Sequence, residues 1–141
     1  MRLPKILSGL MILSTIGLGF AFSGPSVSAA DKLIFVTENA EGDRFYLNQN
    51  WLKAEKFGYV DFVSTMRLAE PSSDGILFVD SHHKGHCETS RIGMMSIQLY
   101  NVNDKLVTEK KFKVLEIDIV DRGSVNELLL DAACRILKTA R

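Results

Sequence analysis

Apolar and polar residues alternate along several short stretches of the chain, and the clearest alternation covers residues 59–70. Val60, Phe62 and Met66 fall on one side of this stretch, while the opposite side carries Asp61 and other mainly polar residues. A period of two with one mainly apolar face is typical of a half-buried β-strand. The pattern therefore predicts that this part of the chain is one strand of a sheet.

Further short stretches have a strand-like composition and are separated by turn-forming residues. We predict strands at residues 33–37, 44–47, 76–80, 91–100, 105–112 and 114–120. The stretch at 105–112 is rich in Lys and Glu, which suits a strand at the edge of a sheet. Residues 51–57 are expected to form one helical turn or an irregular link.

The pattern changes to a helical period near the end of the chain. Ser124 and Glu127 have the spacing of a capping box, and Lys138 lies in the final turn, where positive charge suits the helix dipole. The apolar stripe of the predicted helix comprises Val125, Leu128, Leu129, Ala132, Ala133, Ile136 and Leu137. Many strands followed by one terminal helix indicate the α+β class, here an antiparallel β-sheet packed with a C-terminal α-helix.

The segment Met1–Ala30 has the organisation of a secretory signal peptide. A basic N-terminus precedes an apolar run at residues 6–22, and small residues at 27–30 supply the cleavage site. We expect the mature protein to start at Ala30 or Asp31 and to be extracytoplasmic, either periplasmic or secreted. The alternative is a retained membrane anchor, which is disfavoured because the run is shorter than about 20 residues and contains several Ser and Gly residues. Contact with a membrane is thus expected only through the signal peptide before cleavage.

The remainder, Asp31–Arg141, has the length of a single domain. The whole chain holds 17 basic and 17 acidic residues and has no basic block or basic patch with interleaved aromatic residues. Nucleic-acid binding is therefore not expected.

The sequence contains two cysteines, Cys87 and Cys134. An exported chain meets an oxidising compartment, in which a pair of thiols usually forms a bridge. We therefore predict one disulfide between them, which adds roughly 4 kcal/mol of stability in the loop-entropy model. The alternative leaves two free thiols and makes Cys87 available as a metal ligand.

All three histidines lie within the polar stretch 81–89, which is expected to form a loop. His82, His83 and His86 stand beside Cys87, and imidazole and thiolate are good ligands for zinc or copper. However, one short loop seldom supplies four ligands in tetrahedral order, and a disulfide would remove the thiolate. The favoured interpretation is a solvated polar loop beside a disulfide, with no metal and no cofactor.

Two groupings contain the residue types of a nucleophilic enzyme. Asp80, Ser81 and His82 supply the types found in a catalytic triad, and His86 precedes Cys87. Triad members normally converge from distant chain positions, and no nucleophile-elbow pattern is present. Sequence neighbours rarely face each other, and a catalytic thiol must be free. We therefore predict no catalytic residues and no enzymatic activity.

Aromatic side chains offer a candidate binding surface. Trp51, Tyr59 and Phe62 could form one, but in a small β domain such residues more often fill the core. We expect core positions for Phe62 and Trp51.

The chain also resembles the surface-adhesin protein E family of small exported bacterial domains. The resemblance rests on short motifs spread over the mature chain: Phe45-Tyr46-Leu47-Asn48, Tyr59-Val60-Asp61-Phe62, Cys87 ahead of a strand ending in Tyr100, Gly123-Ser124, Leu128-Leu129 and Ala133-Cys134. It implies that the Gly-Ser pair opens the terminal helix and that the helix cysteine pairs with the mid-chain cysteine. Asn48 stands where the family often has Asp, and the family's Trp before the Gly-Ser pair is missing.

The resemblance also implies binding rather than catalysis. The expected function is an exported non-enzymatic domain that binds an envelope or extracellular macromolecule, in the manner of an adhesin. The alternative is a metal-binding protein that uses His82, His83 and His86.

Overall fold

A computed structural model describes residues 32–113 and 115–139. Asp31–Arg141 forms one compact unit. The segment predicted to be a signal peptide, Met1–Ala30, lies outside the described residues. Within those residues, no helix is both long enough and apolar enough to cross a membrane.

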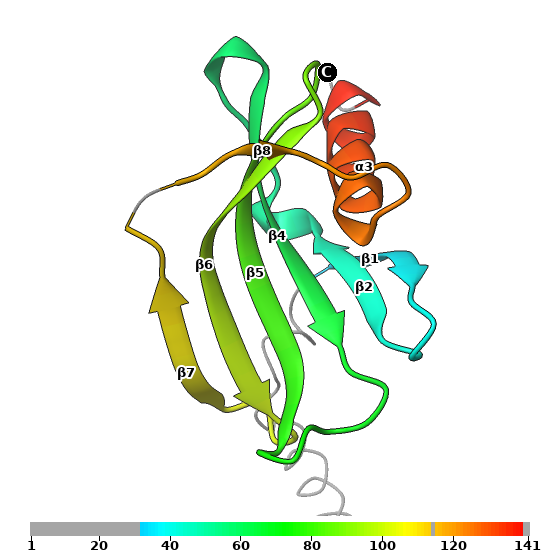
Figure 1. Cartoon of the computed structure of the whole chain (residues 1–141), viewed down its shortest axis with the longest axis vertical. Coiled ribbons are helices and arrows are strands. Elements are labelled where there is room, and N and C mark those ends of the chain that lie inside the picture. Colours follow the sequence, from blue (N-terminus) through cyan, green and yellow to red (C-terminus); the bar gives the residue numbers. More distant parts are fainter. Residues whose placement is uncertain (1–31, 114, 140–141) are drawn as a thin grey trace, which may run out of the picture. The chain divides into compact units, whose positions relative to one another are not determined.

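The domain is built on one antiparallel β-sheet, which Figure 1 shows as a curved layer with a single helix beside part of it. Six strands follow in the order β1-β2-β4-β5-β6-β7, and the short strands β3 and β8 pair with β4 and β6. The strands are β1 (Leu33–Glu38), β2 (Arg44–Asn48), β3 (Lys53–Ala54), β4 (Tyr59–Arg67), β5 (Ile76–His86), β6 (Arg91–Asn101), β7 (Leu106–Lys111) and β8 (Asp118–Ile119). The predicted antiparallel sheet with a C-terminal helix and one disulfide is present, and the described residues are mostly β.

The expectation of a loop at residues 81–89 is wrong for most of that stretch. Strand β5 does not end at Asp80 but continues to His86. The reason is that β4 and β6 both pair with β5 as far as His86, so the backbone of the polar residues is hydrogen-bonded within the sheet on both sides. Their side chains alternate between a buried and a more exposed face, in a pattern that runs without interruption from Val79 to His86.

The predicted strand at residues 114–120 is also shorter than expected, because only Asp118–Ile119 pairs with β6. After β7 the chain leaves the ladder and crosses close to Gly93 of β6. A Cβ atom at Gly93 would lie 2.6 Å from the carbonyl oxygen of Glu116. The absence of a side chain there lets the crossing segment approach the sheet.

The predicted terminal helix is observed as α3 (Val125–Thr139). Its N-terminus has the predicted cap, since the Glu127 N–H donates to Ser124 Oγ at 3.1 Å. The Glu127 carboxylate accepts from the N–H of Gly123 at 2.8 Å. In a standard capping box this carboxylate accepts from the N–H of the N-cap residue, here Ser124, so the contact is shifted by one residue.

Helix α3 packs mainly on β1, β2 and β4 and leaves much of the β5–β7 half of the sheet without a helix (Figure 1). The largest fully buried side chains are Leu47, Phe62, Leu129 and Leu130. They form the core between the helix and the covered strands.

The core prediction holds for Phe62 and is wrong for Trp51, which is 60% exposed. Trp51 ends the short 3-10 helix η1 (Gln49–Trp51), whose N-cap is the buried Asn48. The Asn48 side chain accepts the N–H of Asn50, which turns the chain out of the strand and breaks its alternation. Leu52 takes the place against the core that was expected for Trp51.

Candidate functional site

The three histidines diverge because they lie on a strand rather than in a loop. His83 faces the helix side of the sheet and is 3% exposed, while its neighbour His82 points to the other face. His86 ends the strand, and Cys87 is bonded to Cys134. In the described part of the chain, no group of three His, Cys, Asp or Glu residues could hold a metal ion.

The suggested triad does not assemble either. Ser81 faces the helix side of the sheet, whereas the Asp80 carboxylate is on the other face and accepts from Thr65 Oγ1 at 2.6 Å. Alternation along β5 separates the two side chains for the same reason that it separates His82 from His83.

Sequence reasoning missed a different pair, Ser64 and His83. Ser64 Oγ lies 3.0 Å from His83 Nε2, although the two residues are 19 positions apart. Antiparallel pairing of β4 with β5 brings them together, because Phe62 is the direct partner of His83 and Ser64 is the next residue on the same face. The His83 ring also stacks on Phe62 with a centroid distance of 4.9 Å.

The environment of His83 keeps it uncharged near neutral pH. Burial, and to a smaller extent the nearby His82, lower the pKa of His83 from 6.5 to about 4. His83 therefore places a neutral imidazole in a mostly apolar hollow beside the helix.

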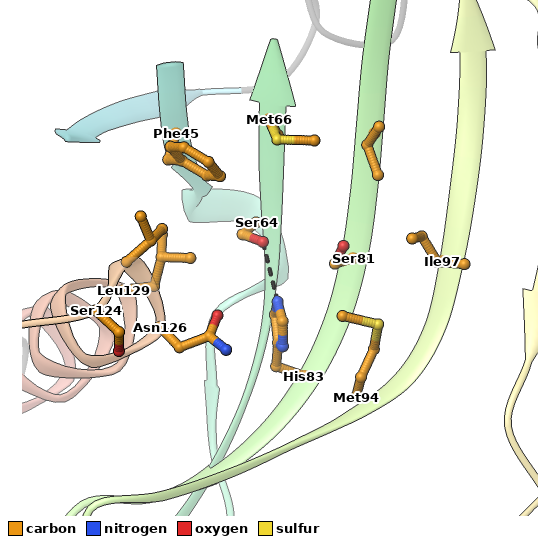
Figure 2. A pocket seen from close by; sticks show the side chains of 12 residues that line it. Phe45, Ser64, Met66, Ser81, His83, Met94, Ile97, Ser124, Asn126 and Leu129 are labelled. Carbon is orange, nitrogen blue, oxygen red and sulfur yellow. Dashed lines mark hydrogen bonds between the residues drawn. The ribbon is translucent and has the colours of Figure 1, made fainter. Parts of the chain in front are cut away.

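We call this hollow the central groove; it has a volume of about 340 Å³. Figure 2 shows Ser64 and His83 joined by a hydrogen bond, with Asn126 from the first turn of α3 directed toward the same imidazole. The groove is lined by Phe45, Ser64, Met66, Val79, Ser81, His83, Met94, Ile97, Ser124, Val125, Asn126 and Leu129. None of these side chains carries a formal charge when His83 is neutral.

A second region lies at the end of the sheet where the disulfide attaches the helix. Strands β3 and β4 form a hairpin there, and its turn is the 3-10 segment η2 (Lys56–Gly58). Both central residues of the turn have positive φ, 59° at Phe57 and 82° at Gly58, and the Tyr59 N–H donates to the carbonyl of Lys56. This is the pattern of a type I′ hairpin turn, which normally takes Asn or Gly at its first central position. Phe57 occupies that position with 85% of its surface exposed.

The turn is fixed to its neighbours by His86. The Nε2–H of His86 donates to the carbonyl of Phe57 at 2.8 Å, and Nδ1 then accepts from the hydroxyl of Thr89 at 2.9 Å. The ring also packs edge-on against Tyr59 at 4.7 Å between centroids. The N–H of Cys87 donates to the carbonyl of Gly58 at 3.2 Å, so the hairpin turn is tied to the disulfide.

We call this region the disulfide end. Its groove has a volume of about 720 Å³ and lies between the hairpin, the β5–β6 turn and the last turns of α3. The lining residues are Ala54, Glu55, Gly58, Tyr59, Val60, Cys87, Glu88, Asp131, Cys134, Arg135, Leu137 and Lys138. Five of them are charged, in contrast to the central groove.

No family model matches this chain, and no curated protein matches it. The resemblance to the surface-adhesin protein E family therefore stays a prediction from the motifs.

Proposed function

We propose that the protein is an exported, non-enzymatic domain that binds an envelope or extracellular protein through its disulfide end. The observation that carries the proposal is Phe57, a bulky aromatic residue held in left-handed backbone conformation at the tip of a hairpin and 85% exposed. Strained backbone at an exposed position is a reason to look for function there.

Phe57 is a poor choice for the stability of the hairpin. A residue with a Cβ atom loses about 1 kcal/mol or more in the left-handed region, which Asn and Gly tolerate better. Burial does not offset this loss, since the ring is almost fully exposed. A sequence that breaks a local rule without a gain in folding is expected where a residue serves binding.

The disulfide end presents Phe57 on a rigid support. His86 holds the carbonyl of Phe57, and the Cys87–Cys134 bridge fixes the adjacent turn to α3. A backbone that is already held in place loses less conformational entropy on binding, and aromatic anchors inserted into a partner's pocket dominate many protein interfaces. The charged residues around the neighbouring groove suit the polar rim of such an interface.

Two observations support a role without catalysis. With a pKa of about 4, His83 would be a weak general base near neutral pH. Ser64 pairs through its backbone with Leu47 on one side and Ser81 on the other, so its own N–H lies within the sheet ladder and is not directed at an oxyanion. The disulfide is compatible with an oxidising, extracytoplasmic location.

The test is capture of a partner by the full chain carrying its disulfide, immobilised and exposed to the envelope and extracellular fractions of its own cells. Wild type is compared with Phe57→Asn, which removes the ring and suits the turn, and with Val102→Asn. Val102 is 52% exposed in the β6–β7 turn at the far end of the sheet (Figure 1) and serves as the matched control.

We expect a protein that is retained by wild type and by Val102→Asn and is lost from Phe57→Asn. Truncation of an anchor of this kind weakens binding by about 2 kcal/mol or more, roughly thirtyfold. Equal capture by all three proteins, or capture by none of them, would contradict the proposal.

A further inference from the structure

We infer that the central groove is a binding site for a small uncharged amphiphile, a short alkyl chain or ring that ends in a hydroxyl, ester or amide group. The site is separate from the disulfide end and does not depend on the protein partner proposed above. Three properties of the groove lead to this class of ligand: its walls, its floor and its lack of charge.

The walls are apolar and only half covered. Met66, Val79, Met94 and Ile97 line the groove on strands β4, β5 and β6. All except Val79 are partly exposed, because α3 packs mainly on the other half of the sheet. Flexible thioether side chains adapt to ligands of irregular shape, as they do at many binding surfaces.

The floor is polar where the strand pattern calls for apolar residues. Ser64, Ser81 and His83 occupy helix-side positions that are buried in the sheet, next to Phe62 and Val79. Ser64 Oγ and His83 Nε2 form a hydrogen bond with one another at 3.0 Å. In the described part of the chain, the Ser81 hydroxyl and the Asn126 amide make no side-chain hydrogen bond. Both remain available to a polar group of a ligand in the groove.

The absence of charge selects the head group. An ion placed in a recess without a charged partner loses several kcal/mol of hydration, whereas a hydroxyl or amide needs only hydrogen bonds. His83 does not supply a positive charge, since burial keeps it neutral near pH 7. The volume of about 340 Å³ is at the lower end of small-molecule sites, so the groove fits one short chain or ring rather than a polypeptide segment.

The test compares two fluorescent dyes that share a ring system. N-phenylnaphthylamine is uncharged, and anilinonaphthalene sulfonate carries an additional sulfonate. The full chain with its disulfide intact is titrated with each dye near pH 7. We expect the uncharged dye to bind about tenfold or more tightly than the sulfonate, and decanol to displace it about tenfold more effectively than decanoate.

Two neighbouring substitutions on β6 locate the site. Ile97→Trp fills the groove, whereas Gln98→Trp places the same side chain on the opposite face of the same strand. We expect a loss of affinity of about tenfold in the first and less than about twofold in the second. Both proteins carry the same N-terminal segment, so dye bound there would not distinguish them.

Ser81→Ala provides a second, milder variant that keeps the test decisive if Ile97→Trp does not fold. It removes one hydroxyl from the floor. We expect the ratio of the affinity for decanol to the affinity for decane to fall about fivefold. Equal affinity for the two dyes, no dye binding, equal losses in the two Trp variants, or an unchanged advantage of decanol in Ser81→Ala would each overturn the inference.

Discussion

The central groove and the disulfide end differ in how the chain holds their functional groups. Secondary structure and packing place the polar groups of the central groove: Ser64 and His83 are fixed by the β4–β5 ladder and by the stack on Phe62. At the disulfide end, a covalent bond and the hydrogen bonds of one histidine hold a strained and exposed turn at the tip of the short β3–β4 hairpin. The central groove is expected to lose function only when the sheet is disturbed. The disulfide end is expected to lose function when either the disulfide or the His86 side chain is removed.

The two regions also differ in charge. The lining of the central groove is uncharged, whereas five charged residues line the groove at the disulfide end. A recess without charge suits a small neutral ligand, and a wider hollow with a charged rim suits a protein surface. The two proposals together assign two different kinds of recognition to one sheet with one partly covering helix.

Removal of the disulfide is expected to give the largest effect. The bridge closes a loop with a sequence separation of 47, so Cys87→Ser combined with Cys134→Ser should lower the free energy of unfolding by about 4 kcal/mol. Urea unfolding followed by circular dichroism measures this change. Under conditions in which the variant remains folded, we expect partner capture to fall while the central groove still binds the uncharged dye. Parallel loss of both activities in folded protein would show that the two regions are not independent.

The next effect is a pH dependence that belongs to the central groove. Because the pKa of His83 is lowered to about 4 in the folded state, the unfolded chain takes up this proton first as the pH falls below 6.5. The contribution to stability is fully present above pH 6.5 and is lost as the pH falls through about 4. The total change is on the order of 3 kcal/mol.

Urea unfolding at several pH values, with two matched variants, isolates this contribution. His83→Gln should flatten the decline in stability between neutral and acidic pH, whereas His82→Gln, on the opposite face of β5, should leave a decline close to that of wild type. If both variants follow the wild-type profile, burial of His83 does not govern the acid response.

Two glycine substitutions, which are expected to change stability less, distinguish steric crowding by His86 from backbone strain in the hairpin turn. Gly58 and Gly75 have nearly the same φ, 82° and 80°, but a Cβ atom at Gly58 would lie 3.1 Å from His86 Nε2, while Gly75 has open space around it. We expect Gly58→Ala to lower the free energy of unfolding by about 2 kcal/mol and Gly75→Ala by about 1 kcal/mol. Equal losses would mean that His86 yields without resistance and is not a rigid brace.

Much of the fold follows from the sequence, because strands β1, β2, β4, β6 and β7 and helix α3 carry clear local patterns. The capping residues Ser124 and Glu127 located the start of the helix to within one residue. The sequence predicts only the first half of strand β5, because the second half is polar and local composition does not show that a segment has pairing partners on both sides. Trp51 was misplaced because the Asn48 cap turns the chain at a point where alternation predicted continuation.

The candidate sites were less accessible to sequence reasoning. The Ser64–His83 pair depends on the register between two strands, and the polar composition around His83 predicts a loop instead of a strand. A signal for the hairpin did exist, since Gly58 follows Phe57 between two alternating segments. The signal is weak because Phe is unusual at a position that requires positive φ.

The central claim is that Phe57 is kept at the hairpin tip for binding and at the expense of stability, and the unfolding free energy of Phe57→Asn tests it most directly. Asn tolerates the φ of 59° better than Phe does, so the account predicts that the variant is more stable than wild type by about 1 kcal/mol in urea unfolding. The same variant should fail to capture the protein partner. A variant that is less stable than wild type would show that the exposed ring stabilises the fold, and would contradict the account.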